Sequence, residues 1–280
     1  MRFHSRAAAL LATLLLAAAH LASAQSSLRL RFLDVGQGDA ILITNGGRTV
    51  LVDTGPTDDI APHLRRLGVD TVDLLIIPHP HLDHLGGADA VLERFPVRNY
   101  MDNGVPYTTA AYRKVLRLVR ARKVRYLRAD TRRIEVGDAT LDILPIPAAT
   151  RDDPNPNNQS IGVVLRRGTF TALLTGDSQV EEINGWLDAG LLPADVKVEK
   201  AAHHGSRNGM TPALLARTRP EVVVVSVGAG NSYGHPSPWA MRYYRTSGRR
   251  VLRTDEVGDV LIQVESNGAY SVHVQRSAIP

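Results

Sequence analysis

The sequence contains no cysteine among its 280 residues. This absence excludes disulfide bonds, thiolate metal ligands and cysteine nucleophiles. A metal bound by this chain must therefore be held by nitrogen and oxygen ligands alone, and the fold must be stabilised by its core. Long apolar runs are also missing after the first residues. Since a membrane-spanning helix needs about 20 apolar residues, we expect no transmembrane segment after the N-terminal segment is removed.

Residues 1–24 have the pattern of a secretory signal peptide. A basic start is followed by an apolar core, Ala7–Ala19, and by the A-x-A cleavage site Ala22-Ser23-Ala24. The alternative is an uncleaved anchor or a buried helix, but the apolar core is shorter than a bilayer span. We therefore expect cleavage after Ala24 and an exported protein, either periplasmic or secreted. The remaining residues, 25–280, are sufficient for a single domain with its own core.

The densest group of chemically active side chains follows the apolar run Val72–Ile77. Three imidazoles and one carboxylate fall within six residues: His79, His81, Asp83 and His84. Histidine is the commonest protein ligand for zinc-like ions, and aspartate is a frequent oxygen ligand. The alternatives are a histidine-rich surface loop or histidines satisfied within the core. A cluster of this density directly after a strand favours a metal site over both.

The local sequence predicts how these side chains are presented. Two prolines make the preceding residues extended, and residues two apart in an extended chain point to the same side. We therefore expect His79, His81 and Asp83 to converge. His84 is expected in the turn that leads into a helix over Ala88–Phe95.

A basic segment without acidic residues begins at Arg113, extends to Arg128 and is followed by Arg132 and Arg133. The simplest interpretation is a solvated helix face. The functional interpretation is a patch, Arg113–Arg133, that attracts phosphodiesters, nucleic acids or other polyanions.

Hydrophobic patterning predicts strand groups interrupted by helices, and hence an α/β layered fold. The predicted strands are Leu28–Asp34, Ala40–Thr44, Thr49–Asp53, Val72–Ile77, Arg133–Val136, Leu141–Ile146, Ile161–Arg166, Phe170–Leu174, Asp195–Lys200, Glu221–Val227, Val251–Arg253, Val260–Glu265 and Tyr270–Val274. The predicted helices are Asp59–Leu67, Ala88–Phe95, Tyr112–Lys123, Gln179–Ala189, Pro212–Arg217 and Pro238–Ser247. Residues 148–159, rich in Pro, Asn and Asp, are expected to form an exposed loop. Further polar clusters follow strands at Asp177, at His203-His204 and at His235, where active sites are often assembled.

These motifs, in this order and spacing, resemble the metallo-β-lactamase superfamily. The matching elements are Leu51-Val52-Asp53-Thr54-Gly55, the His79 to His84 motif, Thr175-Gly176-Asp177 and the late histidine loop. A closer resemblance is to the extracytoplasmic hydrolase domain of ComEC-type DNA-uptake proteins. Its pattern is seen in residues 32–40, in Asn158-Gln159-Ser160, in His203-His204-Gly205-Ser206 and in residues 231–237. The resemblance implies a four-layer αββα sandwich with a metal site at one edge.

The resemblance also implies roles for individual residues. His79 and His81 would bind a first divalent ion, Asp83 and His84 a second, and Asp177 would bridge them. One histidine of the His203-His204 pair would complete the second site. Asp53 would orient the ligands from behind, and His235 would face the substrate as a proton donor or a phosphate contact.

One departure from the superfamily pattern concerns the first ion. Many members carry a further histidine ligand in the loop where this chain has Asn157, Asn158 and Gln159. The ligand set therefore leaves open whether one or two ions bind. Zn²⁺ fits the histidine-rich set best, and Mn²⁺ also suits a site that contains carboxylates.

We therefore expect an exported metal-dependent hydrolase, a phosphodiesterase or nuclease that uses a metal-activated hydroxide, with Asp83 and His235 taking part in the chemistry. The first alternative is the same fold acting on a lactam, lactone or other ester. The second alternative is a non-catalytic module that binds polyanions.

Overall fold

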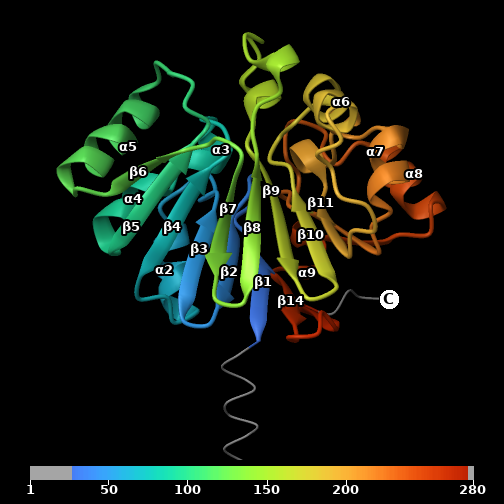
Figure 1. Cartoon of the computed structure of the whole chain (residues 1–280), viewed down its shortest axis with the longest axis horizontal. Helices are drawn as coiled ribbons and strands as arrows, with labels where there is room; N and C mark the ends of the chain where they lie inside the picture. The colour runs from blue at the N-terminus through green and yellow to red at the C-terminus, as the bar shows by residue number, and fades with distance from the viewer. Residues whose placement is uncertain (1–26, 277–280) are drawn as a thin grey trace, which may run out of the picture.

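Two β-sheets lie face to face at the centre of the computed structural model, which describes residues 27–276 (Figure 1). The predicted signal peptide, residues 1–24, lies outside the described residues. The first sheet has eight strands in the order β15-β14-β1-β2-β3-β4-β5-β6. Its strands are β1 (Leu28–Phe32), β2 (Ile41–Asn45), β3 (Arg48–Val52), β4 (Val72–Ile77), β5 (Val97–Asp102), β6 (Arg125–Arg128), β14 (Val260–Val264) and β15 (Tyr270–Val274).

The second sheet has seven strands in the order β13-β12-β11-β10-β9-β8-β7. Its strands are β7 (Arg132–Val136), β8 (Ala139–Leu144), β9 (Gly162–Arg167), β10 (Phe170–Leu174), β11 (Val198–Lys200), β12 (Val222–Val225) and β13 (Arg250–Arg253). Strands β3 to β6 are mutually parallel, and so are β10 to β13. Each sheet therefore brings several carboxyl strand ends to one edge of the sandwich.

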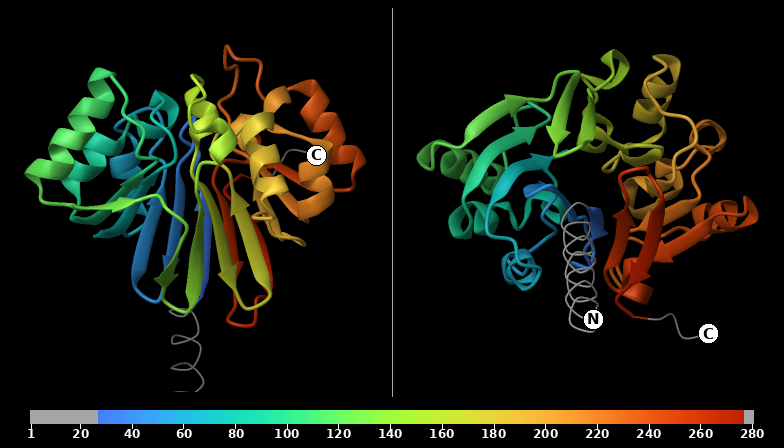
Figure 2. Two further views of the ribbon diagram at one scale, coloured as in Figure 1. Left: turned by 45° about the horizontal axis from the view of Figure 1, so that its top comes forward. Right: turned by 60° about the horizontal axis from the view of Figure 1, so that its bottom comes forward.

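Helices cover the outer face of each sheet, as both views of Figure 2 show. The helices over the first sheet are α2 (Ile60–Arg66), α3 (Leu82–Leu85), α4 (Ala88–Arg94) and α5 (Ala110–Ala121). Those with the second sheet are α6 (Val180–Asp188), α7 (Pro212–Thr218), α8 (Pro238–Thr246) and the short α9 (Thr254–Val257). Single 3₁₀ turns lie at Ala148–Thr150, Pro156–Gln159, Ala202–Gly205 and Arg207–Gly209. Among the described residues, none of the helices combines the length and apolarity needed to cross a membrane.

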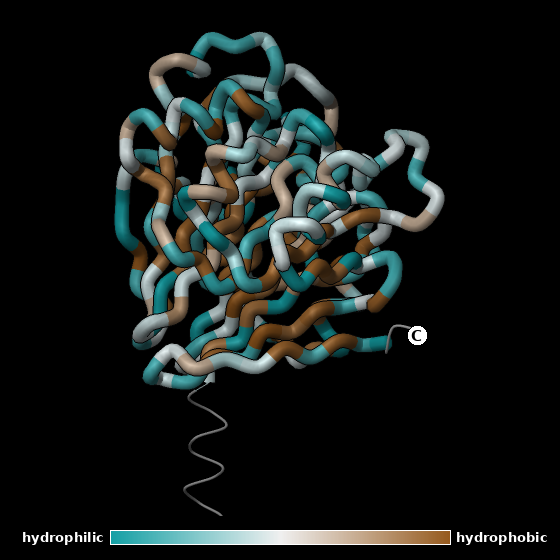
Figure 3. The backbone as a smooth tube through the Cα atoms, turned by 90° about the vertical axis from the view of Figure 1, so that its right-hand side faces the viewer, coloured by the Kyte–Doolittle hydropathy of each residue, from teal (hydrophilic) through white to brown (hydrophobic). Residues whose placement is uncertain are grey.

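The hydrophobic pattern explains why the layers stack. Strand β1 alternates buried and more exposed residues, and its buried Leu28, Leu30 and Phe32 lie in the core between the two sheets. Strand β10 is buried along its whole length because both its faces are covered. Figure 3 shows hydrophobic residues concentrated along the interior segments and hydrophilic residues in the surrounding loops. The αββα architecture expected from the sequence is confirmed.

Three local predictions need correction. Strands β5 and β6 were not predicted, because β5 carries few of the apolar residues that mark a strand and three of its six residues are only partly buried or exposed. The chain does not stay extended to Asp83, because it turns at His81 into the one-turn helix α3. The loop before β9 is exposed only in part, since residues 157–159 form a buried 3₁₀ turn.

An acidic side chain is buried on the outer face of the second sheet. Glu199 on β11 is fully buried, and neither of its oxygens has a hydrogen-bond partner among the described residues. The neighbouring Thr218 hydroxyl donates its hydrogen to the carbonyl of Leu214 instead. Burial raises the pKa of Glu199 to about 7, against a smaller opposing effect of Thr218 and Arg249.

This raised pKa makes stability depend on pH. Because the folded pKa lies above the unfolded value, the penalty from Glu199 is absent below about pH 4.5, grows between pH 4.5 and about 7, and keeps its full value above that. We expect Glu199→Gln to raise the free energy of unfolding by about 2–3 kcal/mol at pH 8.5 and by little at pH 5, measured by urea denaturation. The exposed Glu265→Gln serves as control. An equal effect at both pH values would contradict the assignment.

Candidate metal centre

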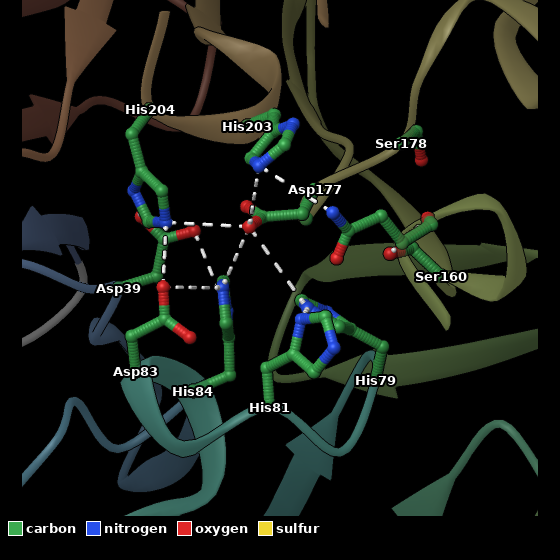
Figure 4. Close-up of polar contacts among 12 residues, drawn as sticks. Asp39, His79, His81, Asp83, His84, Ser160, Asp177, Ser178, His203 and His204 are labelled. Carbon is green, nitrogen blue, oxygen red and sulfur yellow. Dashed lines mark hydrogen bonds and ion pairs between the residues drawn. The ribbon is translucent and has the colours of Figure 1, made fainter. Parts of the chain in front are cut away.

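The predicted site residues follow the carboxyl ends of parallel strands at one edge of the sandwich. Figure 4 shows the side chains of His79, His81, Asp83, His84, Asp177, His203 and His204 gathered together. Asp53 follows β3, the His79–His84 segment follows β4, and Asp177 follows β10. The His203-His204 pair follows β11, and His235 lies in the loop after β12. The fold therefore assembles, from distant parts of the chain, every residue that the sequence indicated.

Helix α3 determines which way Asp83 and His84 point. Because the chain turns at His81, Asp83 lies on a helical turn and comes close to His204. The turn packs tightly against the preceding loop: a Cβ on Gly86 would lie 2.2 Å from the carbonyl oxygen of Pro56. Glycine at this position is therefore a requirement of the site.

Four side-chain atoms form a compact ligand set. The Nε2 of His84 lies 3.1 Å from the Oδ2 of Asp177 and 3.8 Å from the Oδ2 of Asp83. The Nε2 of His204 lies 3.2 Å from the same Asp83 oxygen and 3.3 Å from the same Asp177 oxygen. Ligands in a tetrahedron around a zinc-like ion, with bonds of ~2.0–2.1 Å, are separated by about 3.3–3.4 Å. These four atoms therefore fit one divalent ion.

A second, smaller set adjoins the first. The Nε2 of His79 and the Nδ1 of His81 lie 3.2 Å apart, and this Nε2 lies 3.9 Å from the Oδ2 of Asp177. A single oxygen of Asp177 thus stands between two groups of donor atoms. This is the geometry that a bridging carboxylate requires.

The other oxygen of Asp177 is held by a buried lysine that sequence reasoning did not single out. The Nζ of Lys200, which is fully buried, lies 3.3 Å from Asp177 Oδ1 and donates to the carbonyl of Gly176 at 2.7 Å. It also forms an ion pair of 2.5 Å with Asp39 Oδ2. The available signal was a lysine at the end of a strand, three residues before the paired histidines.

Asp39 lies in the sequence pattern of residues 32–40, which predicted no role for it. It belongs, with His84, Asp177 and His204, to a buried group whose ligand atoms lie within 4.8 Å of one another. Its oxygens, however, face the Nδ1 atoms of His84 at 3.7 Å and His204 at 3.6 Å. These Nδ1 atoms are on the far side of each ring from the ligand atoms, so Asp39 lies behind the ligand set.

Both histidines of the ligand set are oriented by contacts at Nδ1, the ring nitrogen opposite the ligand atom. The Nδ1 of His84 lies 3.1 Å from Asp53, as the sequence implied for that carboxylate, and the Nδ1 of His204 lies 2.9 Å from the carbonyl of Ser226. A hydrogen on each Nδ1 leaves the Nε2 lone pair directed at the ligand set.

The paired histidines adopt an unusual backbone conformation. His203 and His204 have φ values of 49° and 53°, in the left-handed region that non-glycine residues rarely occupy. Asp53, with φ of 63°, shares this strain. Conformations of this kind cost on the order of 1–3 kcal/mol each and occur preferentially at functional sites. The strained turn sends His204 into the ligand set and leaves His203 at the wall of an adjacent cavity.

Charge in the cluster is unevenly shared. Burial lowers the pKa of both His79 and His81, which favours the neutral form that binds metals. Burial also opposes the charged form of His204, but Asp177 and Asp39 outweigh it and raise its pKa to about 9. The pKa of His84 is likewise held well above its ordinary value, against burial, by Asp177 and Asp53. Metal binding at the four-atom ligand set of Asp83, His84, Asp177 and His204 must therefore displace protons.

Several buried atoms of the cluster have no hydrogen-bond partner among the described residues. They include the Nε2 of His84, which faces the other ligand atoms, and the Nδ1 of His79. Buried polar atoms are rarely left unsatisfied unless an ion or water completes them. The nitrogen and oxygen donors present here fit a divalent metal.

The sequence description of the metallo-beta-lactamase superfamily matches residues 33–229 of the chain. The chain belongs to this superfamily. Among curated relatives, ComE operon protein 3 of Bacillus subtilis (strain 168) is 26% identical over 269 residues, which cover 86% of this chain and 34% of the relative. Recombination protein 2 of Haemophilus influenzae is 30% identical over 229 residues, covering 76% of this chain and 25% of that protein. The chain thus spans about a third or less of the length of these relatives.

Solved structures support the superfamily fold. A metal-dependent hydrolase of the beta-lactamase superfamily, Tm1679, aligns with a TM-score of 0.53 at 17% identity, covering 87% of this chain and 98% of the other. A diphosphatase from the PhnP family aligns with a TM-score of 0.50 at 15% identity, covering 89% and 98%. At such low identity, these likenesses show the fold alone.

An open cavity of about 650 Å³ adjoins the ligand atoms of the superfamily site. Its lining includes His81, Asp83, Asn157, His203 and His235. The Asn157 amide lies close to both His81 and His203, in the loop where many superfamily members have a third histidine ligand. A substrate can therefore reach the proposed ligand atoms from solvent.

The buried lysine yields a prediction. Removing one partner of a buried ion pair costs roughly 3–5 kcal/mol, because the other charge is left uncompensated. We expect Lys200→Met to lower the free energy of unfolding by about this amount in EDTA, and by less with saturating Zn²⁺, since the metal then compensates Asp177. Thermal and urea unfolding under both conditions measure the difference.

Lys197→Met is the matched control, because Lys197 pairs with Glu221 at the partly exposed start of the same segment. We expect it to change stability by less than about 1 kcal/mol. If Lys200→Met lowers the free energy of unfolding equally with and without metal, the lysine does not compensate the negative charge of Asp177.

Proposed function

We propose that this protein is an exported metal-dependent phosphodiester hydrolase that acts on nucleic acid. The observation that carries the proposal is the pair of donor sets that share the Oδ2 of Asp177 and open into the 650 Å³ cavity. Two ions held about 3.5–4 Å apart suit an in-line displacement at phosphorus, because each ion faces one of the exchanging oxygens. Export is proposed from residues 1–24.

The chain's own residues fix the geometry for this reaction. A bound divalent ion lowers the pKa of a water molecule toward neutrality and offsets charge on a phosphoryl oxygen. Asp53 and the Ser226 carbonyl hold the rings of His84 and His204, so their ligand atoms do not reorient during turnover. The absence of thiolates leaves a nitrogen and oxygen set that suits Zn²⁺ or Mn²⁺.

His235 is placed to contact a bound phosphate. Its ring meets that of His203 edge to face, with centroids 5.2 Å apart, and stacks with the ring of Tyr233 at 5.9 Å. Burial lowers its pKa to about 4, with His203 and His204 adding to the effect. A neutral ring is a hydrogen-bond donor at pH 7, so we favour a phosphate contact over proton donation. Asn231 holds this loop, donating to the His235 carbonyl at 2.6 Å and accepting from its backbone N–H.

The relatives favour nucleic acid over other phosphodiesters. They are named for competence and recombination, and a structure with a similar fold is titled a diphosphatase. A lactam or lactone substrate would suit the same donor set, but the names of these relatives do not favour one. A non-catalytic role in polyanion binding would leave the ligand atoms without a purpose.

Part of the basic segment forms a continuous row on helix α5. Arg113, Arg117 and Arg120 are exposed at helical spacing, so they lie on one face over about 10 Å of helix axis. The helix begins directly after Thr109, which lines the cavity. This arginine row therefore leads away from the proposed reaction centre and suits the backbone of a nucleic-acid strand.

The rest of the segment does not extend this row. Lys114 is paired with Asp89 and Glu93. Arg125 lies at the first residue of β6, opposite the carboxyl ends that bear the site, and lines a separate groove of about 540 Å³ with Arg48 and Arg98. We therefore restrict the proposed contact surface to the arginine row of α5.

The activity itself is tested with purified protein loaded in turn with Zn²⁺, Mn²⁺ and Mg²⁺. We expect cleavage of bis(p-nitrophenyl) phosphate and of DNA, abolished by EDTA and reduced at least about 100-fold in kcat by Asp83→Ala, which removes a ligand atom and leaves His204 without its partner. Asp255→Ala, in the remote helix α9, is the control.

Turnover of lactams or lactones without any phosphodiester cleavage would replace the proposed substrate. Stoichiometric metal binding with no cleavage of any phosphodiester would contradict the proposed activity.

The arginine row has its own test. We expect Arg113→Gln/Arg117→Gln/Arg120→Gln to raise KM for single-stranded DNA and to reduce the slope of log affinity against log salt by about 2, since each lost phosphate contact removes ~0.7. Turnover of bis(p-nitrophenyl) phosphate should not change.

The matched control, Arg48→Gln/Arg98→Gln/Arg125→Gln, removes the same charge from the opposite end of the molecule. Equal effects of the two triple variants on DNA would show that only net charge matters, and the row would then not be a contact surface.

A further inference from the structure

His203 is held at both ring nitrogens by side-chain amides. The Nε2 of Gln179 lies 3.3 Å from its Nδ1, and the Nδ2 of Asn157 lies 3.4 Å from its Nε2. With both amides turned this way, each ring nitrogen would face an N–H donor. An imidazole cannot accept at both nitrogens while it carries a hydrogen on one, so one of the two amides must be turned the other way.

Gln179 cannot be the one that turns. The backbone N–H of Asn157 donates to the Oδ1 of Asn155 at 3.2 Å, which fixes the amide of Asn155. The Nδ2 of Asn155 then donates to the Oε1 of Gln179 at 3.0 Å. The remaining Gln179 nitrogen must face His203, so the Nδ1 of His203 accepts and bears no hydrogen. This also excludes a doubly protonated ring.

The Asn157 amide is therefore turned, with its oxygen toward His203. The two orientations of an amide exchange the positions of its oxygen and nitrogen, so the hydrogen-bond partners decide between them. In the other orientation the Oδ1 of Asn157 is buried without a hydrogen-bond partner. Turning the amide supplies that missing partner, because the Nε2–H of His203 then donates to it.

In its metal-binding form, the neighbouring His204 has the opposite tautomer. Its Nδ1 donates to the carbonyl of Ser226, which leaves the Nε2 lone pair for a metal. The Nε2 of His203 also lies farther from Asp177 Oδ2, at 3.8 Å compared with 3.3 Å for His204. Two adjacent histidines thus differ in which ring nitrogen carries the hydrogen.

We propose that His203 presents an Nε2–H to the cavity as a hydrogen-bond donor for an anionic substrate oxygen, while His204 alone of the pair binds metal. Gln179 is the positioning residue that fixes this tautomer. When substrate is absent, the donor is held by Asn157. When a phosphoryl group enters, the His203 Nε2–H exchanges its acceptor: its hydrogen bond to the Asn157 amide oxygen is replaced by one to the more negative phosphoryl oxygen. This assignment rests on the proposed metal-dependent hydrolysis.

The tautomer is read directly by ¹⁵N NMR of histidine-labelled protein loaded with Zn²⁺, with His203→Gln used to assign the signals. We expect His203 to be protonated at Nε2 without and with Zn²⁺, and its Nε2 signal to shift on adding inorganic phosphate. In Gln179→Glu a carboxylate replaces the donor, so the hydrogen should move to Nδ1. A His203 signal showing metal bound at Nε2 in the unaltered protein would overturn the proposal.

Paired substitutions separate donation from ligation. His203→Gln retains an N–H at a similar reach, whereas His203→Leu has none. We expect His203→Leu to lose about 10²–10³-fold in kcat on bis(p-nitrophenyl) phosphate, as for loss of an oxyanion donor, and His203→Gln to recover much of it. Both should retain the same zinc content per chain by elemental analysis.

A loss of zinc in both variants would show that His203 is a ligand. If the unaltered protein cleaves no phosphodiester, the proposed function fails. The NMR and zinc measurements still decide the tautomer and the ligand role of His203, so the two failures are distinguishable.

Discussion

The site depends on one carboxylate, Asp177, whose two oxygens contact two different kinds of partner. Lys200 takes its Oδ1, and the imidazoles of His84 and His204 lie within 3.3 Å of its Oδ2. All of these groups are almost completely buried. Isolated buried charges are costly, and only a well-arranged set of opposite charges makes such a cluster tolerable. Lys200 supplies a permanent cation, so the carboxylates keep their positions whether or not a metal is bound.

The sandwich exists, in functional terms, to bring this cluster together. Parallel strands in both sheets deliver their carboxyl ends to one edge, and each loop contributes one or two side chains. The left-handed backbone of Asp53, His203 and His204 is a cost that the surrounding packing must outweigh. Strain of this kind is expected where side-chain direction matters more than local stability. The αββα core holds the strand ends in place, and the short loops that follow them carry the ligand side chains.

The sequence predicted the elements with strong periodicity and the residues with distinctive chemistry. The His79–His84 motif, Asp177 and the late histidines were identified because histidine clusters after strands are rare. Strand β6 was missed because three of its four residues are exposed, two of them arginines, so no apolar pattern marks it. Lys200 and Asp39 were missed because a single lysine or aspartate beside a strand is unremarkable until the fold buries the two together.

Two features of the site depend on tertiary contacts that no local pattern encodes. Asp83 reaches its partner His204 only because the chain turns at His81, and the extended geometry expected from the prolines ends there. The buried turn at residues 157–159 looked like a surface loop because amides and prolines usually lie in solvent. Here, amide N–H groups of the turn find partners inside the fold: Asn158 donates to the Glu181 carboxylate and Gln159 to the backbone carbonyl of Arg151.

The most direct test of this account is the metal content of the purified protein after loading with Zn²⁺ or Mn²⁺ and removal of free ions, compared with that of Asp177→Asn. We expect one or two ions per chain in the unaltered protein and a loss of bound metal in the variant, because one oxygen of Asp177 belongs to both donor sets. A folded protein that retains no divalent metal, or a variant that retains all of it, would contradict the central claim.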